Sequence, residues 1–304
     1  MNTKQLWLAV LMSGCAVTSH QTQVATLGTA RSSTELVAAI AQPGTVELES
    51  INSADWAVER SGLINLGSPI AKQAGLVDGE EKIQIYFHVI RHPTRGTFIV
   101  DTGVENALGT APEKSAMSGL VRSAMHLEKL TVNQGLGTWL AKNKIDGVFL
   151  THLHLDHITG MADVPAGTPV FTGPGEAKDS QFMYLFVRGS TDRALEGKPA
   201  LSEWQFTADP AGAFDGVLDI FGDGSVWALW VPGHTPGSTA YLVNTPRGAV
   251  LLTGDASHTR WGWENHVEPG TFTGNAARGL ESFKKLQSFV TSHPEIEVRL
   301  GHQH

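Results

Sequence analysis

The stretch that decides the fold is "THLHLDHITG", residues 151–160. Three histidines and an aspartate fall close together in it, with leucines between them: His152, His154, Asp156 and His157. The apolar run "GVFL" comes just before and predicts a short buried strand that feeds a loop. Because alternate residues of an extended segment share one face, His152 and His154 should point to the same side.

These side chains have the chemistry of metal ligands. Imidazole nitrogens and carboxylates suit a borderline ion such as zinc. A catalytic zinc ion uses three protein ligands and leaves one position open, so four ligands in one short segment indicate two metal ions. The chain has a single cysteine, Cys15, so the remaining ligands must be His, Asp or Glu.

Further candidate ligands follow other predicted strands. His234 lies in "WVPGHTPGST", Asp255 in "LLTGDASH" and His302 in "VRLGHQH", and each comes just after an apolar β-type run. Any one of them alone would be read as an ordinary turn residue. Loops at strand ends gather at one edge of a sheet. Together with residues 151–160, they therefore predict one composite site.

The other patterned segments predict two sheets flanked by helices. Strand-type texture covers residues 45–51, 82–90 and 96–103, and the last two read as a hairpin around the turn signal "RHPTRG". Apolar residues at helical spacing occupy residues 115–130, 135–145 and 275–290.

The N-terminus, "MNTKQLWLAVLMSGC", has Lys4, then the apolar run 6–12, then small residues before Cys15. This pattern predicts a secretory signal over residues 1–14. It resembles a bacterial lipoprotein signal, with Cys15 as the lipidated first residue. The alternative is an ordinary signal peptide that happens to contain a cysteine. Residues 15–42 are small and polar and read as a tether, which leaves residues 43–304 as the domain.

The amino-acid composition and the net charge limit the classes of binding partner. The chain is 41% hydrophobic and 17% charged, which is typical of a globular protein. Its formal net charge is −8 and it has no Lys/Arg cluster, which argues against nucleic acids and anionic membrane surfaces as partners. We therefore expect a small-molecule substrate, contact with a membrane only through a lipid anchor, and an exported envelope lipoprotein that faces the periplasm from the outer membrane.

The four motifs at residues 151–160, 231–238, 251–257 and 301–302 resemble those of the metallo-β-lactamase superfamily. The resemblance implies an α+β fold, a four-layer αββα sandwich with two metals at one edge of its paired sheets. It implies His152, His154 and His234 around one metal, and Asp156, His157 and His302 around the second, with Asp255 bridging both.

The bridging aspartate and the lack of an available cysteine make the chain more similar to the glyoxalase-II-like and N-acyl-homoserine-lactonase-like branch. Those lactonases often carry a tyrosine three residues after the bridging aspartate, where this chain has His258. His258 is either a proton donor to an oxyanion or leaving group, or a solvent-facing loop residue.

Two further features stay open at this point. Asp101 ends the strand "TFIV", and it is either a common turn aspartate or, as the resemblance implies, a residue that orients a ligand histidine. The aromatic segments "FMYLF" (182–186) and "WGW" (261–263) either line an apolar pocket or are aromatic residues of the core or of an interface.

The expected function is that of a metal-dependent hydrolase with two Zn²⁺ ions, or other divalent metals. Two cations that share a bridging hydroxide would direct it at a lactone or carboxylic ester. The resemblance to the family implies that Asp156 both binds metal and holds the proton of the nucleophile. Phosphoester, thioester and β-lactam substrates are alternatives on the same site. A different class is a non-catalytic metal-binding protein of the envelope.

Overall fold

Alternating side chains in the central strands set the layers of the molecule. In β13 (Val226–Trp230), Val226 and Ala228 pack into a core between two sheets, whereas Trp227 and Leu229 pack into another core beneath helices. Successive residues of a strand point to opposite faces. A strand that is apolar on both faces therefore has to be covered on both.

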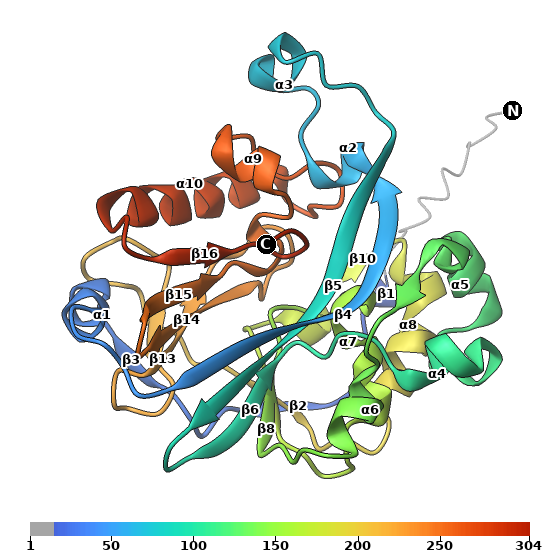
Figure 1. Cartoon of the computed structure of the whole chain (residues 1–304), viewed down its shortest axis with the longest axis horizontal. Coiled ribbons are helices and arrows are strands. Elements are labelled where there is room, and N and C mark those ends of the chain that lie inside the picture. Colours follow the sequence, from blue (N-terminus) through green and yellow to red (C-terminus); the bar gives the residue numbers. More distant parts are fainter. Residues whose placement is uncertain (1–14) are drawn as a thin grey trace, which may run out of the picture.

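The computed structural model describes residues 15–304, which form two stacked sheets (Figure 1). The larger sheet has eight strands in the order β2 (Thr22–Val24), β11 (Leu201–Glu203), β9 (Val170–Thr172), β8 (Gly147–Phe149), β6 (Gly96–Val100), β5 (Glu80–His92), β4 (Glu47–Glu59) and β7 (Thr131–Val132). The smaller sheet has six strands in the order β16 (Glu297–Arg299), β15 (Gly248–Leu252), β14 (Thr239–Thr245), β13, β12 (Val217–Asp219) and β3 (Thr29–Arg31). A separate two-stranded sheet pairs β1 (Cys15–Ala16) with β10 (Ser180–Gln181).

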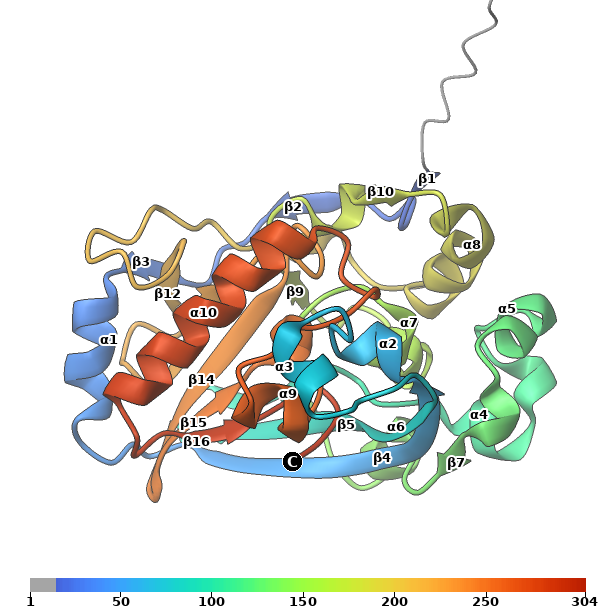
Figure 2. The same cartoon turned by 90° about the horizontal axis from the view of Figure 1, so that it is seen from above.

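Helices cover the outer face of each sheet (Figures 1 and 2). The eight-stranded sheet is covered by α4 (Asn106–Thr110), α5 (Gly119–Ala124), α6 (Leu136–Leu140), α7 (Leu155–Ile158) and α8 (Tyr184–Ala194), and the six-stranded sheet by α1 (Ser33–Ile40) and α10 (Ala276–Ser292). The remaining helices are α2 (Arg60–Leu63), α3 (Pro69–Gln73) and α9 (Arg260–Glu264), with 3₁₀ turns η1 (Pro112–Lys114), η2 (Leu127–Lys129), η3 (Thr159–Asp163), η4 (Glu176–Lys178) and η5 (Gly254–Ala256). None of the helices described in residues 15–304 is long and apolar enough to cross a membrane.

The order helix, sheet, sheet, helix is the predicted four-layer αββα sandwich, and this fold class is confirmed. The predicted hairpin is present as β5 and β6, with His92 opposite Gly96. The helix predicted over residues 115–130 is shorter than expected. It breaks into α5 and η2, because His126 between them has a left-handed backbone with φ of 53°.

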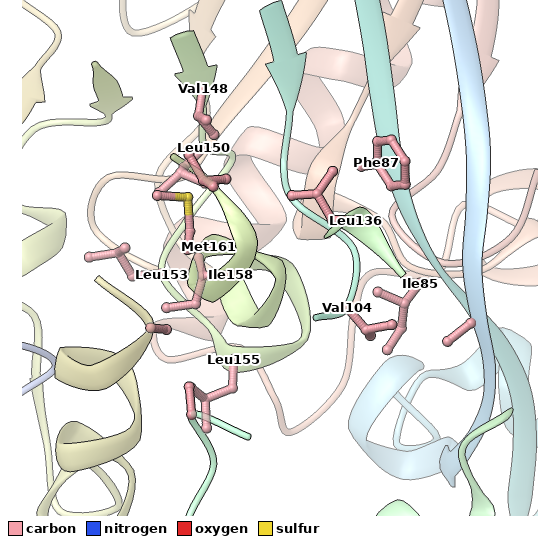
Figure 3. Close-up of a cluster of buried hydrophobic side chains, with 14 of the residues drawn as sticks. Ile85, Phe87, Val104, Leu136, Val148, Leu150, Leu153, Leu155, Ile158 and Met161 are labelled. Atoms are coloured by element: carbon pink, nitrogen blue, oxygen red, sulfur yellow. The ribbon is translucent and has the colours of Figure 1, made fainter. Parts of the chain in front are cut away.

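The leucines of "THLHLDHITG" anchor this segment in the core (Figure 3). Leu153, Leu155 and Ile158 are buried with exposed fractions of 1%, 5% and 0%. They belong to the apolar cluster that fills the space between the eight-stranded sheet and its helices. Because these residues point inward, the polar residues between them are held at fixed positions on the other side of the chain.

The N-terminal residues correct one prediction. Residues 15–42 are not a tether, because β2 pairs in parallel with β11 and β3 pairs with β12, so that they extend both sheets. Helix α1 begins with a capping box between Ser32 and Glu35, and it buries Leu36 completely. The described fold therefore begins at Cys15 rather than at residue 43. The signal predicted over residues 1–14 lies outside the described residues.

The first testable prediction concerns α1. Leu36→Ala should lower the free energy of unfolding by about 2–5 kcal/mol, because it leaves a cavity beneath the six-stranded sheet. Leu120→Ala is the matched control: it is also a leucine in a helix but is 68% exposed, and it should change stability by less than about 0.5 kcal/mol. Urea denaturation of both variants measures the difference. Equal, small effects would mean that α1 does not belong to the folded core.

Candidate metal centre

The seven predicted ligands come from four segments that each follow a strand, and these segments meet at one end of the sandwich. His152 and His154 follow β8, and the next turn of chain, α7, carries Asp156 and His157. The others follow strands of the six-stranded sheet: His234 comes after β13, Asp255 lies in η5 after β15, and His302 comes after β16. Parallel and antiparallel neighbours place these strand ends together, so the loops converge.

Three histidines form the first group: His152, His154 and His234 each offer a ring nitrogen, and these atoms lie within 4.8 Å of one another. His154 Nδ1 lies 2.8 Å from His234 Nε2. His152 and His234 are almost fully buried, at 1% and 2% exposure.

A second group contains Asp156, His157, Asp255 and His302. Asp255 Oδ1 lies 3.3 Å from His157 Nε2 and 3.4 Å from His302 Nε2. Asp156 Oδ2 lies 3.4 Å from His302 Nε2. The other oxygen of Asp255, Oδ2, faces the first group and lies 3.4 Å from His234 Nε2. Asp255 therefore stands between the groups and presents one oxygen to each.

The spacing and the free atoms fit a metal pair. Nitrogen and oxygen ligands at about 2.0–2.1 Å from a tetrahedral ion lie about 3.3 Å apart, close to the separations seen here. Buried atoms without a hydrogen-bond partner, among the described residues, include His152 Nε2, His157 Nε2 and Asp255 Oδ1. Buried polar atoms are normally hydrogen-bonded. Orphaned atoms in each of the two groups are what a cation in that group would satisfy.

Hydrogen bonds on the far side of the rings hold two histidines in the form that a metal requires. His302 Nδ1 lies 2.9 Å from the Gln84 carbonyl oxygen. A carbonyl only accepts hydrogen bonds, so Nδ1 must carry a proton, and Nε2 is the nitrogen that a metal would bind. His157 Nδ1 makes the same kind of bond to Asp101 Oδ2, at 2.8 Å.

Asp101 also reaches the first group. Its oxygens accept from the Thr151 backbone N–H and from the Thr151 hydroxyl, both at 2.8 Å. The Thr151 hydroxyl donates its hydrogen bond to Asp101. Its oxygen can therefore accept a hydrogen bond from His152 Nδ1, which lies 3.1 Å away. Asp101 has a left-handed backbone, with φ of 54°, which is unusual for a residue other than glycine. The carboxylate thus orients one histidine of each group.

Charge divides the two groups. Burial lowers the pKa of His152, His154 and His234, so these rings are neutral and ready to bind a cation. Burial acts in the same direction on His157 and His302, but neighbouring carboxylates, above all Asp255, outweigh it and raise both pKa values. A metal in the second group therefore has to displace protons, which makes its binding tighter as the pH rises.

His258 lies inside the cluster, and the prediction of a solvent-facing position is not supported by its 1% exposure. Its Nδ1 lies 3.2 Å from the Leu63 carbonyl oxygen, so this nitrogen carries a proton. Its Nε2 lies 3.2 Å from Asp255 Oδ2 and has no hydrogen-bond partner.

Glu176 is a residue of this site that sequence reasoning missed. It lies in η4, is 1% exposed, and accepts from the Leu153 N–H at 2.8 Å, between two candidate ligands. It also accepts from the Thr235 hydroxyl at 2.6 Å and the Gly237 N–H at 2.9 Å, just after His234. Burial raises the pKa of Glu176 to about 7, although these hydrogen bonds oppose the shift. Glu176 ties together the two loops that carry the first group.

Thr151 and Tyr184 were also missed in these roles. Tyr184, within "FMYLF", is buried, donates to Asp179 Oδ2 at 2.6 Å and lies 3.4 Å from His154 Nε2. Its neighbours in that segment are exposed, so they do not belong to the core, and the alternative that they form an interface stays open. Of these two residues, only Thr151 could have been suspected from the sequence, because it stands directly before the candidate ligand His152.

The second testable prediction concerns Glu176. Glu176→Gln replaces an accepting oxygen with a donating amide, so at least one hydrogen bond to the ligand loops is lost. Zinc affinity should fall about 10–100-fold, as for other partners that orient ligands. Zinc titration against a competing chelator measures it.

Glu105→Gln is the matched control. Glu105 is also buried, with a pKa raised to about 7, but it accepts from the Ala116 N–H and contacts none of the ligand loops. Both variants should lose stability, but only Glu176→Gln should lose zinc affinity. Equal zinc affinity in the two variants would contradict the inference that Glu176 positions the loops that carry the first group of histidines.

Comparison with known proteins agrees with this geometry. The sequence model of the metallo-beta-lactamase superfamily matches residues 82–288. The N-acyl homoserine lactonase AttM of Agrobacterium fabrum is 28% identical over 229 residues, which cover 73% of this chain and 82% of that protein. A mutant of AiiA from B. thuringiensis, solved with N-decanoyl-L-homoserine at its active site, has a TM-score of 0.59 at 18% identity and covers 86% of this chain and 94% of its own.

A further solved structure, AidC, is described as a dizinc quorum-quenching lactonase. It has a TM-score of 0.54 at 14% identity and covers 86% of this chain and 89% of its own. At these identities the two structures support the fold, and the matched residues 82–288 support the family. The predicted family, the predicted fold and the predicted enzyme class, a hydrolase, are therefore confirmed. The chain belongs to the metallo-beta-lactamase superfamily.

Proposed function

We propose that the protein is a lactone hydrolase that holds two zinc ions. The observation that carries this proposal is the position of Asp255, which presents one oxygen to each group of histidines. The relatives reported above add support, because AttM is an N-acyl homoserine lactonase. His152, His154 and His234 would hold one ion, Asp156, His157 and His302 the other, and Asp255 both.

When bound, two zinc ions would activate a shared water molecule at neutral pH and polarise the carbonyl group of the substrate. The chain's own residues would do the rest. The side chain of Asp156 is 18% exposed, compared with 4% for Asp255, so it faces the open side of the site. There it would take the proton that the attacking water loses.

His258 would act on the other side of Asp255. As an imidazolium, protonated at Nε2 as well as at Nδ1, it would donate the Nε2 proton to the developing oxyanion or the leaving alkoxide and return to the neutral ring. Its ring is fixed by the bond from Nδ1 to the Leu63 carbonyl, so that Nε2 faces the site. It stands in the position where similar lactonases often carry a tyrosine, which is also a donor.

A non-catalytic metal-binding role is the main alternative. A storage or structural site tends to complete the shell of its ion with protein ligands. Here each ion would have three ligands of its own and the shared Asp255, and the 18% exposure of the Asp156 side chain leaves the centre open to a water molecule as a fifth ligand. This donor set favours catalysis over storage.

We also propose that the protein is exported and anchored through a lipid on Cys15, at the outer membrane. The support is the sequence "LMSGC" at residues 11–15, with the apolar run before it. Because Cys15 already belongs to the fold, in β1, the lipid would be attached directly beside the domain.

The third testable prediction concerns Asp255. Zinc-loaded protein should hydrolyse lactones in a screen that also contains aryl esters, thioesters, phosphotriesters and cephalosporins. Asp255→Asn removes the charge that lets two dications share a site. It should bind one zinc ion instead of two, and kcat should fall far more than KM rises. Two bound zinc ions with no hydrolysis of any substrate by the parent protein would favour the storage role.

The fourth concerns His258. His258→Phe keeps the ring shape without its nitrogens and should lower kcat by about 10²–10⁴-fold with two zinc ions still bound. His258→Tyr restores a donor and should recover part of the rate. Steady-state kinetics and metal analysis measure both. Loss of one zinc ion in His258→Phe would make His258 a metal ligand instead.

The fifth concerns Cys15. Mass spectrometry of the protein from a bacterial membrane fraction should find Cys15 as the first residue, carrying lipid. Cys15→Ser should keep residues 1–14. Cleavage elsewhere, with an unmodified Cys15, would contradict the lipid anchor.

A further inference from the structure

Four large apolar side chains are exposed next to one another in the chain. Phe182, Met183, Leu185 and Phe186, just before and within the first turn of α8, have exposed fractions of 55%, 68%, 54% and 58%. We call them the docking segment. Contiguous exposed apolar side chains on a soluble domain mark a surface that contacts something else.

The fold places Cys15 beside this segment. Strand β1 pairs with β10 in antiparallel register, with Cys15 opposite Gln181, the residue just before Phe182. Arg188, one turn further along α8, donates to Cys15 Sγ at 2.8 Å. Figures 1 and 2 both show β1, β10 and α8 side by side. A chain that enters the fold at Cys15 therefore arrives next to the four exposed side chains.

We propose that the docking segment inserts into a lipid bilayer at the level of the headgroups, beside the anchor. This inference rests on the proposed lipidation of Cys15, and it adds a protein contact to a membrane association that the lipid alone would supply. Aromatic and aliphatic residues on the first turn of a surface helix are suited to that depth. One attachment point leaves a domain free to rotate, and a second, apolar contact would fix its orientation.

The orientation matters because the docking segment adjoins the metal centre. Tyr184 lies between Met183 and Leu185 but points inward, and its hydroxyl is 3.4 Å from His154 Nε2. Docking through this turn would bring the metal centre close to the bilayer. Lactones with long acyl chains, which partition into membranes, would then be the substrates that the protein meets at highest concentration.

A bilayer is favoured over a second copy of the chain by the position of Cys15, because a lipid attached there holds the docking segment at the membrane surface. Electrostatics would contribute little, since the net charge is −8. Binding should therefore depend on apolar contact and persist in high salt, which screens attraction between charges.

Vesicle flotation without any lipid anchor tests the segment itself. The chain from residue 15 onward contains every element that the structure describes, and Cys15→Ser prevents lipidation. It should float with vesicles of phosphatidylethanolamine and phosphatidylglycerol. Adding Phe182→Ser and Phe186→Ser should lower the partition coefficient at least about tenfold. Val24→Ser is the control, because Val24 is 65% exposed on β2, away from β10 in Figure 1.

Flotation that is lost in the double variant, kept in Val24→Ser and resistant to salt supports the proposal. No flotation of the parent, or equal flotation of the double variant, overturns it. It is also overturned if sedimentation shows a dimeric parent and a monomeric double variant without vesicle binding, because the segment is then a contact between copies. Circular dichroism and zinc content show that each variant is folded.

Hydrolysis of a short-chain lactone, measured on the same samples, separates this inference from the proposed function. The double variant should keep the parent's rate on that soluble substrate. Flotation without lactone hydrolysis would refute the lactonase and leave the docking segment in place. Lactone hydrolysis without flotation would refute the membrane contact of the docking segment and leave the proposed lactonase activity in place.

Discussion

The buried carboxylate of Asp255, surrounded by imidazole rings, is the interaction on which the rest of the site depends. Asp255 is 5% exposed, and its oxygens lie 3.2–3.4 Å from the Nε2 atoms of His157, His234, His258 and His302. Such a cluster is costly to bury unless charge is balanced. The carboxylate raises the pKa of His157 and His302, which favours their charged forms, and two cations would balance its charge in their place. The same arrangement therefore explains both the raised pKa values of those rings and the fit to a metal pair.

The scaffold fixes this cluster from several directions. The leucines that alternate with the candidate ligands in "THLHLDHITG" are buried in the core and hold this segment in place. Asp101 orients His157 directly and His152 through Thr151. Glu176 joins the two loops of the first group, and backbone carbonyls set the proton positions on His258 and His302. Three of the candidate ligands, His152, His157 and His302, are thus held by a hydrogen bond on the far side of the ring, which reduces the reorganisation that metal binding requires.

The convergence of the candidate ligands was predictable, because each of these His and Asp residues follows an apolar run of the sequence and the ends of the strands meet at one edge of the sheets. Glu176 was not, because its partners are 23, 59 and 61 residues away and "GPGEAK" contains no motif. Residues 15–42 were misread for a related reason. Strands β2 and β3 have three residues each and pair with strands far along the chain, so no local periodicity reveals them. The capping box of Ser32 and Glu35 was a readable helix signal, and the polar composition around it obscured that signal.

Anomalous X-ray scattering at the zinc edge, from crystals of zinc-loaded protein, tests the two-metal account most directly. The account predicts two peaks per chain. One should lie among His152, His154 and His234, the other among Asp156, His157 and His302, with an oxygen of Asp255 bound to each. A single peak at saturating zinc, or two peaks with Asp255 bound to neither, would contradict it.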